Sequence, residues 1–146
     1  MTRPSDQTAR DEQPTLADYQ SAASLRAAVR SFLRRGEQAA RRAGLTPQRQ
    51  LLLLMIKGAP DGSERATIGE LADRLQVAAN TVTELADRAE AAGLVAREPS
   101  EGDGRVVCLR LSDEGERRLA ATVSELRADR RELVQTLADL DLPELR

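Results

Sequence analysis

The sequence predicts a mainly α-helical protein with one small β-hairpin. Apolar residues recur at helical spacing over most of the 146-residue chain. Tyr19 and Phe32 are its only aromatic residues, so the core must consist of Leu, Val and Ala, which suits packed helices. Two short alternating segments on either side of a Gly-containing turn, near residue 100, predict the hairpin.

The N-terminal third is expected to hold a flexible tail and two helices. Residues 1–14 are polar and predict the tail. Apolar residues from Leu16 to Leu33 predict a long helix that ends near Gly44. Thr46–Pro47 begins the next helix, because Thr is a favourable N-cap and Pro a favourable first residue. That helix runs through the apolar residues 51–56 and stops before a loop rich in Gly and Pro.

Two short helices joined at a sharp corner are expected next. Thr67 and Glu70 predict a capping box, in which each side chain satisfies a backbone N–H at the start of a helix. This helix covers about Ile68–Leu75, and a turn follows at residues 76–78. The second helix of the pair runs to Ala92, with Gly93 as a natural C-terminal residue.

The C-terminal part is expected to hold the hairpin and one long helix. Residues 94–98 and 105–111 predict the two strands, with a turn at 99–104. Alternation along the second strand is expected to place Cys108 on its more exposed face. Ser112 is expected to cap a helix from Asp113 to about Ala138, and residues 140–145 to form one further short turn.

The corner between the two short helices fits a helix-turn-helix. This motif needs apolar residues where the helices touch and a small residue where they come closest. Ala72 is the small residue, while Gln76 stands where the turn usually has Gly. The apolar positions are Leu71, Leu75, Val77, Val82 and Leu85. A helical hairpin in an ordinary all-α domain is the less favoured alternative, because a β-hairpin follows.

These motifs resemble the MarR family (multiple antibiotic resistance regulators) from about Leu45 to Leu119. The resemblance is carried by Leu45–Thr46–Pro47, TIGELADRL, NTVTELADRAEAAGLV, the Asp103–Gly104–Arg105 hairpin tip and VCLRLSDEGERRL. It implies a winged helix-turn-helix within a single domain at 15–146. The DNA-binding lobe would cover about 45–111, and dimerisation helices about 15–44 and 112–146.

The same resemblance implies a function. Similar proteins are homodimers that bind double-stranded DNA, mostly as repressors, and many release DNA when a small, often phenolic, molecule binds. We therefore expect a sequence-specific, ligand-responsive repressor that acts on a palindromic operator.

Four residues in the first turns of the second corner helix are candidate base contacts. Asn80 can pair with adenine, and the Thr81 and Thr83 methyl groups can touch the thymine methyl. Glu84 can accept a hydrogen bond from cytosine N4. The alternative is that Asn80 and Thr81 only cap the helix.

Three further residues are candidate DNA contacts outside that helix. Arg105, at the hairpin tip, is expected to enter a minor groove, and the family pattern implies that Asp103 holds its guanidinium in place. The alternative for this pair is an exposed salt bridge. Arg49 is expected to contact phosphate.

The distribution of charge argues against a simple DNA-binding helix. Residues 26–58 carry a net charge of +7, whereas residues 77–98 carry −2 and residues 112–146 carry −3. Relatives often have Ser at the cap and basic residues on the exposed face, where this chain has Ala78, Ala79 and Glu84. The basic N-terminal helix is expected either to contact phosphate or to pair with the acidic last helix at a dimer interface. The alternative function is therefore a winged-helix protein-interaction module with weak or no DNA binding.

The composition argues against other function classes. The chain has no His, which excludes a His-based metal site or a catalytic His, and one Cys, which excludes an intrachain disulfide. Because no paired nucleophile and base, phosphate loop or metal cluster is visible, we expect no enzyme activity, no cofactor and no metal. Cys108 is expected to be inert rather than a redox sensor. The chain has neither an apolar run of the ~20 residues that a membrane span needs nor a signal-peptide stretch. We therefore expect a cytoplasmic protein.

Overall fold

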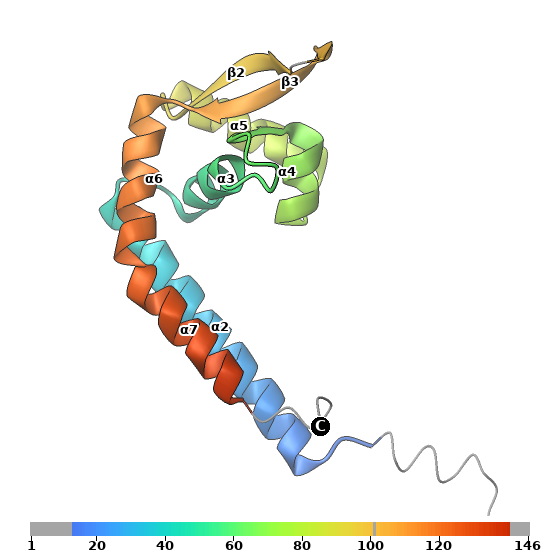
Figure 1. Cartoon of the computed structure of the whole chain (residues 1–146), viewed down its shortest axis with the longest axis vertical. Helices are drawn as coiled ribbons and strands as arrows, with labels where there is room; N and C mark the ends of the chain where they lie inside the picture. The colour runs from blue at the N-terminus through green and yellow to red at the C-terminus, as the bar shows by residue number, and fades with distance from the viewer. Residues whose placement is uncertain (1–12, 101, 141–146) are drawn as a thin grey trace, which may run out of the picture. The chain divides into compact units, whose positions relative to one another are not determined.

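A computed structural model describes residues 13–100 and 102–140, except the side chain of Asp103 (Figure 1). These residues divide into two compact units. One unit, here called the lobe, is Arg35–Arg127. The other, here called the helical unit, contains the residues up to Arg34 and those from Ala128 onward. Nearly all of the expected N-terminal tail lies outside the described residues.

The first two helices agree with the sequence. α2 covers Leu16–Arg42, and α3 covers Pro47–Lys57. Thr46 is the N-cap of α3, and its hydroxyl oxygen accepts a hydrogen bond from the backbone N–H of Arg49 at 3.2 Å. None of the described helices combines the length and apolar character that a membrane crossing requires.

The helix-turn-helix is formed by α4, Ile68–Leu75, and α5, Ala79–Ala91. Both hydrogen bonds of the predicted capping box are present: Glu70 N–H donates to Thr67 Oγ1 at 3.1 Å, and Thr67 N–H donates to Glu70 Oε1 at 3.3 Å. Gln76 takes the left-handed conformation that favours Gly, with φ of 57°. Its side-chain amide donates to the carbonyl of Asp73, and this bond holds the turn.

The apolar contacts of the corner agree with the sequence at all positions but one. Leu71 and Val82 are fully buried, and Ala72, Leu75 and Leu85 pack against the same core. The expectation that Val77 packs between the helices is wrong, because 39% of its surface is exposed. It follows the left-handed residue directly, and that reversal of the chain turns its side chain outward.

The sheet has three strands rather than the expected two. β1, Arg65–Thr67, β2, Val95–Ser100, and β3, Asp103–Leu111, pair antiparallel in the order β1-β3-β2. β1 escaped prediction because three residues are too few to show an alternating pattern. The hairpin also extends into residues 99, 100, 103 and 104, which were expected to form the turn. Pro99 fits there because β2 is an edge strand, and a β-bulge follows it.

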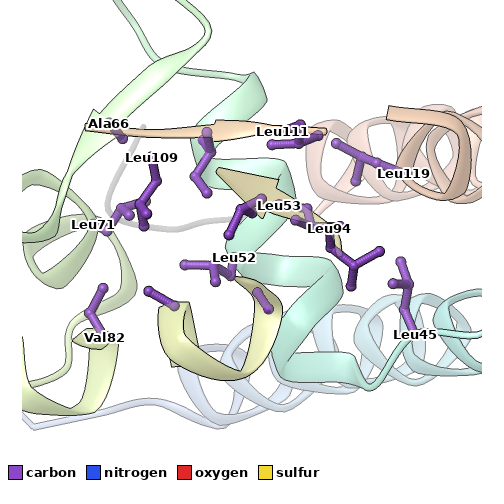
Figure 2. Close-up of a cluster of buried hydrophobic side chains, with 14 of the residues drawn as sticks. Leu45, Leu52, Leu53, Ala66, Leu71, Val82, Leu94, Leu109, Leu111 and Leu119 are labelled. Atoms are coloured by element: carbon purple, nitrogen blue, oxygen red, sulfur yellow. The ribbon is translucent and has the colours of Figure 1, made fainter. Parts of the chain in front are cut away.

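The lobe has one aliphatic core built around α3. Leu52, Leu53 and Ile56 of α3 are completely buried. Figure 2 shows Leu52 and Leu53 among side chains that converge from the other elements of the lobe. These neighbours are Leu45, Ala66, Leu71, Val82, Leu94, Leu109, Leu111 and Leu119. The core therefore consists of Leu, Val, Ile and Ala, as the shortage of aromatic residues predicts.

The expected long last helix is wrong, because it is two helices. α6 covers Asp113–Glu125, and α7 covers Arg127–Asp139. Leu126 separates them with φ of −87° and ψ of 5°, and its side chain is buried. Without Gly or Pro at this point the break has no sequence signal. The expected further turn at residues 140–145 falls, except for Leu140, outside the described part of the chain.

Polar contacts fix α6 to α3 inside the lobe. The side-chain amide of Gln50 donates to Thr122 Oγ1 at 3.4 Å, and both residues are buried. Lys57 Nζ lies 3.0 Å from Glu116 Oε1 and 2.9 Å from Glu64 Oε1. The hydrogen bond to Glu64, followed by that to Glu116, raises the pKa of Lys57, while the bond from Lys57 lowers the pKa of Glu64.

The end of α2 is also fixed to α6. Arg42 forms an ion pair with Glu125, and Arg118 Nη1 donates to the carbonyl of Gly44 at 3.0 Å. At this point a basic residue of α2 pairs with an acidic residue of the C-terminal helices within one chain. For Arg42, the expected pairing of the basic N-terminal helix with the acidic C-terminal helices is therefore present within one chain.

Gly115 provides a test of this packing. A Cβ atom there would lie 2.2 Å from the carbonyl oxygen of Leu94, which is backbone and cannot give way easily. We expect Gly115→Ala to lower the free energy of unfolding by about 1–3 kcal/mol. Urea denaturation followed by circular dichroism measures this loss.

Gly69→Ala is the matched control in α4. Its nearest foreign atom, Thr67 Oγ1, would lie 4.0 Å from the new Cβ. Ala has the higher helix propensity, so stability should rise by up to ~1 kcal/mol. Equal effects of the two substitutions would contradict the close contact at Gly115.

Candidate nucleic-acid interface

The first two turns of α5 present a polar, exposed face. The exposed residues are Asn80, Thr81, Thr83 and Glu84. The residues buried against the lobe are Val82, Ala86 and Ala89. Because side chains three and four residues apart lie on one face of a helix, the buried set anchors α5 and leaves the exposed set for a partner. The structure thus brings together all four residues predicted on this helix, which we call the recognition helix.

Two of these side chains already bond to their own helix. Asn80 Oδ1 accepts from the backbone N–H of Thr81 at 3.0 Å. This bond orients the amide, and it leaves both Nδ2 protons and one lone pair of Oδ1 for a partner. Thr83 Oγ1 donates to the carbonyl of Ala79 at 3.1 Å, so the methyl group is its more available part. Asn80 therefore helps to satisfy the helix start without losing its capacity to contact a base.

The start of the recognition helix is open to an anion. Its N-cap is Ala78, which makes no side-chain hydrogen bond to the first turn. The first N–H groups of a helix carry partial positive charge and bind phosphate oxygens well. Although Asn80 occupies the N–H of Thr81, the absence of a capping side chain at Ala78 leaves part of this capacity in place.

An ion pair joins the recognition helix to the hairpin. Arg97 of β2 contacts Asp87 of α5. Thr83 also faces the hairpin. It lines a small pocket of about 190 Å³ together with Arg97, Val107 and Leu109 of the hairpin and Ile68 of α4. Sequence reasoning missed this pair, since the two residues are ten positions apart on different elements and no motif marks them. The pair compensates one of the acidic charges that count against DNA binding.

The hairpin, or wing, carries Arg105. This residue is exposed and lies two positions after the start of β3. In Figure 1 the wing runs past α4 and α5, and its tip projects beyond them. The expected role of Asp103 in holding the guanidinium falls on a side chain outside the described residues and stays a prediction.

Arg49 belongs to α3 rather than to the recognition helix or the hairpin. It is half-buried in the first turn of α3, and its backbone N–H belongs to the Thr46 cap. The structure gives no direct link between its side chain and the recognition helix. Its phosphate contact therefore also stays a prediction.

Several cations of the lobe serve its own fold. Residues 45–111 contain eight Lys and Arg against ten Asp and Glu, a net charge of −2. Arg65 pairs with Glu98 at 3.0 Å, and Arg74 Nη1 donates to the carbonyl of Gly58 at 3.1 Å. A DNA complex would therefore depend on a few exposed cations, such as Arg88 and Arg105, rather than on a broad basic surface.

Cys108 lies on the predicted face of β3, with the exposed Arg110 and opposite the core residues Leu109 and Leu111, but its own side chain is buried there. Only 8% of its surface is accessible. In the central strand it pairs in register with Thr67 of β1 on one side and Glu98 of β2 on the other. Directly paired residues point to the same face of a sheet, so these two neighbours cover the thiol. The unpredicted strand β1 is thus one reason that a residue on the more exposed face is buried.

Comparison with known proteins agrees with this geometry. Residues 43–106 match the model of the MarR family. The HTH-type transcriptional repressor MdtR of Bacillus subtilis is 38% identical over 73 residues, which are 50% of this chain and 44% of MdtR. The chain spans about half the length of the curated relatives it matches.

Solved structures show the same fold. AbsC, a MarR family transcriptional regulator from Streptomyces coelicolor, superposes with a TM-score of 0.68 at 21% identity, over 91% of this chain and 86% of AbsC. A mutant MarR from E. coli in complex with operator DNA superposes with a TM-score of 0.61 at 22% identity, over 77% of this chain and 78% of that one. The lobe of this chain therefore has the winged helix-turn-helix fold of these MarR-family structures.

The buried position of Cys108 leads to a prediction. We expect Cys108→Ser to leave DNA binding, and its response to peroxide, unchanged, because a residue with only 8% of its surface accessible, between Thr67 and Glu98, reacts slowly. Titration of labelled DNA with and without peroxide measures both. A peroxide-dependent loss of binding that disappears in the variant would instead identify a redox switch.

Proposed function

We propose that this protein is a sequence-specific DNA-binding transcriptional regulator that acts as a homodimeric repressor on a palindromic operator. The observation that carries the proposal is the exposed polar face of the recognition helix beside a wing fixed by the Asp87–Arg97 pair. The repressor named among its relatives and the operator complex of a similar fold support it.

In this proposal each part of the surface has a separate task. The recognition helix enters the major groove, where Asn80, Thr81, Thr83 and Glu84 contact base edges. Its open N-terminus binds a phosphate. Outside the helix, Arg105 of the wing enters a minor groove, held by Asp103, and Arg49 contacts the backbone.

A second copy of the chain is the partner that the helical unit needs. α7 has no buried residue, and the only buried residue of α2 up to Arg34 is Ser21. The exposed large apolar residues of the helical unit are Leu16, Tyr19, Leu25, Leu33 and Val134. Helices without a core of their own are stable when an identical surface covers them, and this gives a two-fold homodimer.

Two further parts complete the proposal without support from a contact in the structure. They are a small-molecule effector of phenolic type, which would release the DNA, and a cytoplasmic location. Neither a cofactor nor catalysis is part of the proposed function.

The second candidate function is a protein-interaction module that has lost DNA binding. The net negative charge of the lobe favours it. Selection from a library of randomised DNA duplexes, followed by gel shift with the enriched duplexes, decides between the two. Enrichment of an inverted repeat supports the regulator, whereas no enrichment at low salt supports the interaction module.

The dimer can be tested without DNA. Sedimentation at micromolar concentration should give a mass of twice 15.9 kDa. Leu33→Glu, which places a charge among the exposed apolar residues of α2, should shift the equilibrium toward the monomer, since burying an unpaired charge is costly. A wild-type protein that sediments as a clean monomer contradicts the dimer and the two-fold mode of binding.

Arg105→Ala should weaken binding through the wing. Each lost contact with DNA should reduce the magnitude of the salt slope by about 0.9, so by roughly 1 to 2 for the dimer. The loss should be greatest on operators with A·T-rich flanks, whose minor grooves are narrow. Fluorescence-anisotropy titrations of the selected duplex at several salt concentrations measure this.

Arg110→Ala is the matched control. Arg110 is an exposed residue of the same strand, but it pairs in register with Arg65 and Ala96, at the base of the wing. The two variants remove the same charge, and thermal stability should stay within ~0.5 kcal/mol for Arg105→Ala. An unchanged slope for Arg105→Ala, or an equal change for both, would mean that the wing tip does not touch DNA.

A further inference from the structure

Glu84 gives the exposed face of the recognition helix a negative charge. We infer that Glu84 is the residue that determines specificity, because its carboxylate accepts a base whose groove edge carries an amino group, cytosine N4 or adenine N6, and rejects other edges. This inference rests on the proposed function and deepens it.

Glu84 lies on the face of α5 that a partner would approach. It is exposed, and it lies four residues after Asn80, so the two side chains share one face of the helix. The neighbouring residue Leu85 packs against the core, and Val82 and Ala86 are buried. Any partner that approaches the exposed side of the first two turns therefore meets the carboxylate of Glu84.

Glu84 differs from Asp87, the other acidic residue near it, in having no ion-pair partner in the described part of the chain. Asp87, the next acidic residue on the helix, is compensated by Arg97. Among the residues that the structure describes, Glu84 forms no ion pair. No ion pair with a described residue neutralises the charge of Glu84, although the exposed Arg88 lies four residues further along the helix. A buried carboxylate without a hydrogen-bond donor is costly.

The chemistry of the major groove turns this cost into discrimination. Cytosine N4 and adenine N6 are donors, whereas guanine and thymine present only acceptor atoms and, for thymine, a methyl group. An ionised carboxylate can only accept. A matching amino group satisfies Glu84, while the wrong base places acceptor against acceptor and leaves the charge unpaired. Specificity obtained in this way comes from repulsion of the wrong partner.

Non-specific binding should be suppressed by the same residue. Non-specific complexes are held by phosphate contacts, and a carboxylate on the docking face opposes them at every sequence. A regulator works against a large excess of competing sites, so the ratio of specific to non-specific affinity matters more than the affinity itself. An acidic recognition helix is consistent with DNA binding on this basis, at the expense of absolute affinity.

Glu84→Gln is the decisive variant, because the amide keeps the shape, removes the charge and can both donate and accept. In selection from randomised duplexes, we expect the variant to lose the preference for an amino-bearing base at one position in each half-site. Against the duplex selected by wild type, substitution of that base should cost wild type roughly 5- to 100-fold in affinity and cost the variant much less. Affinity for a scrambled duplex should rise in the variant.

Glu90→Gln is the matched control, because it removes the same charge from the exposed last turn of the same helix. It should keep the wild-type preference at every position. Equal behaviour of the two variants would show that net charge, not contact with a base, is responsible, and would overturn the inference. If wild type selects a motif and Glu84→Gln selects the same one with equal discrimination, the inference is wrong while the proposed function stands. If wild type selects no motif, the proposed function fails, and the inference fails with it.

Discussion

The burial of one face of α3 is the constraint on which the lobe depends. Leu52, Leu53 and Ile56 are fully buried, and α3 contacts α4, α5, α6, β1 and β3. In a chain with two aromatic residues no single large side chain can fill the interior, so the aliphatic residues of α3 must pack closely against all their neighbours. The recognition helix and the wing are placed by this helix, which itself bears only Arg49 among the candidate DNA contacts.

Polar contacts within the lobe involve many of its cations. Several of its cations join elements: Lys57 links α3 with α6, Arg74 links α4 with the end of α3, and Arg97 links β2 with α5. Because these cations pair within the lobe, its surface offers little positive charge to a polyanion. A protein of this kind must obtain its affinity from shape and from a few contacts, and the arrangement favours discrimination over strength.

Much of the fold could be predicted because its signals are local. The capping box of Thr67 and Glu70, the Thr46–Pro47 start and the apolar spacing of the corner each involve residues less than one or two turns apart. Two of the differences arose away from such local signals, whereas Val77 is turned outward by its direct neighbour Gln76. Cys108 is covered by a strand that begins at Arg65, and the break at Leu126 follows the burial of its side chain. In the candidate site, the exposed face of α5 was predictable from helical periodicity, but the Asp87–Arg97 pair was not.

The exposed position of that pair has a consequence for the response to ionic strength. The Asp87 and Arg97 side chains retain 59% and 36% of their accessible surface, so dissolved ions screen their attraction. The same ions that compete for the phosphates therefore also loosen the attachment of the wing to the recognition helix. Affinity should then fall along a curve that steepens with salt on a double-logarithmic plot, because counterion displacement and the loss of a preorganised wing act together.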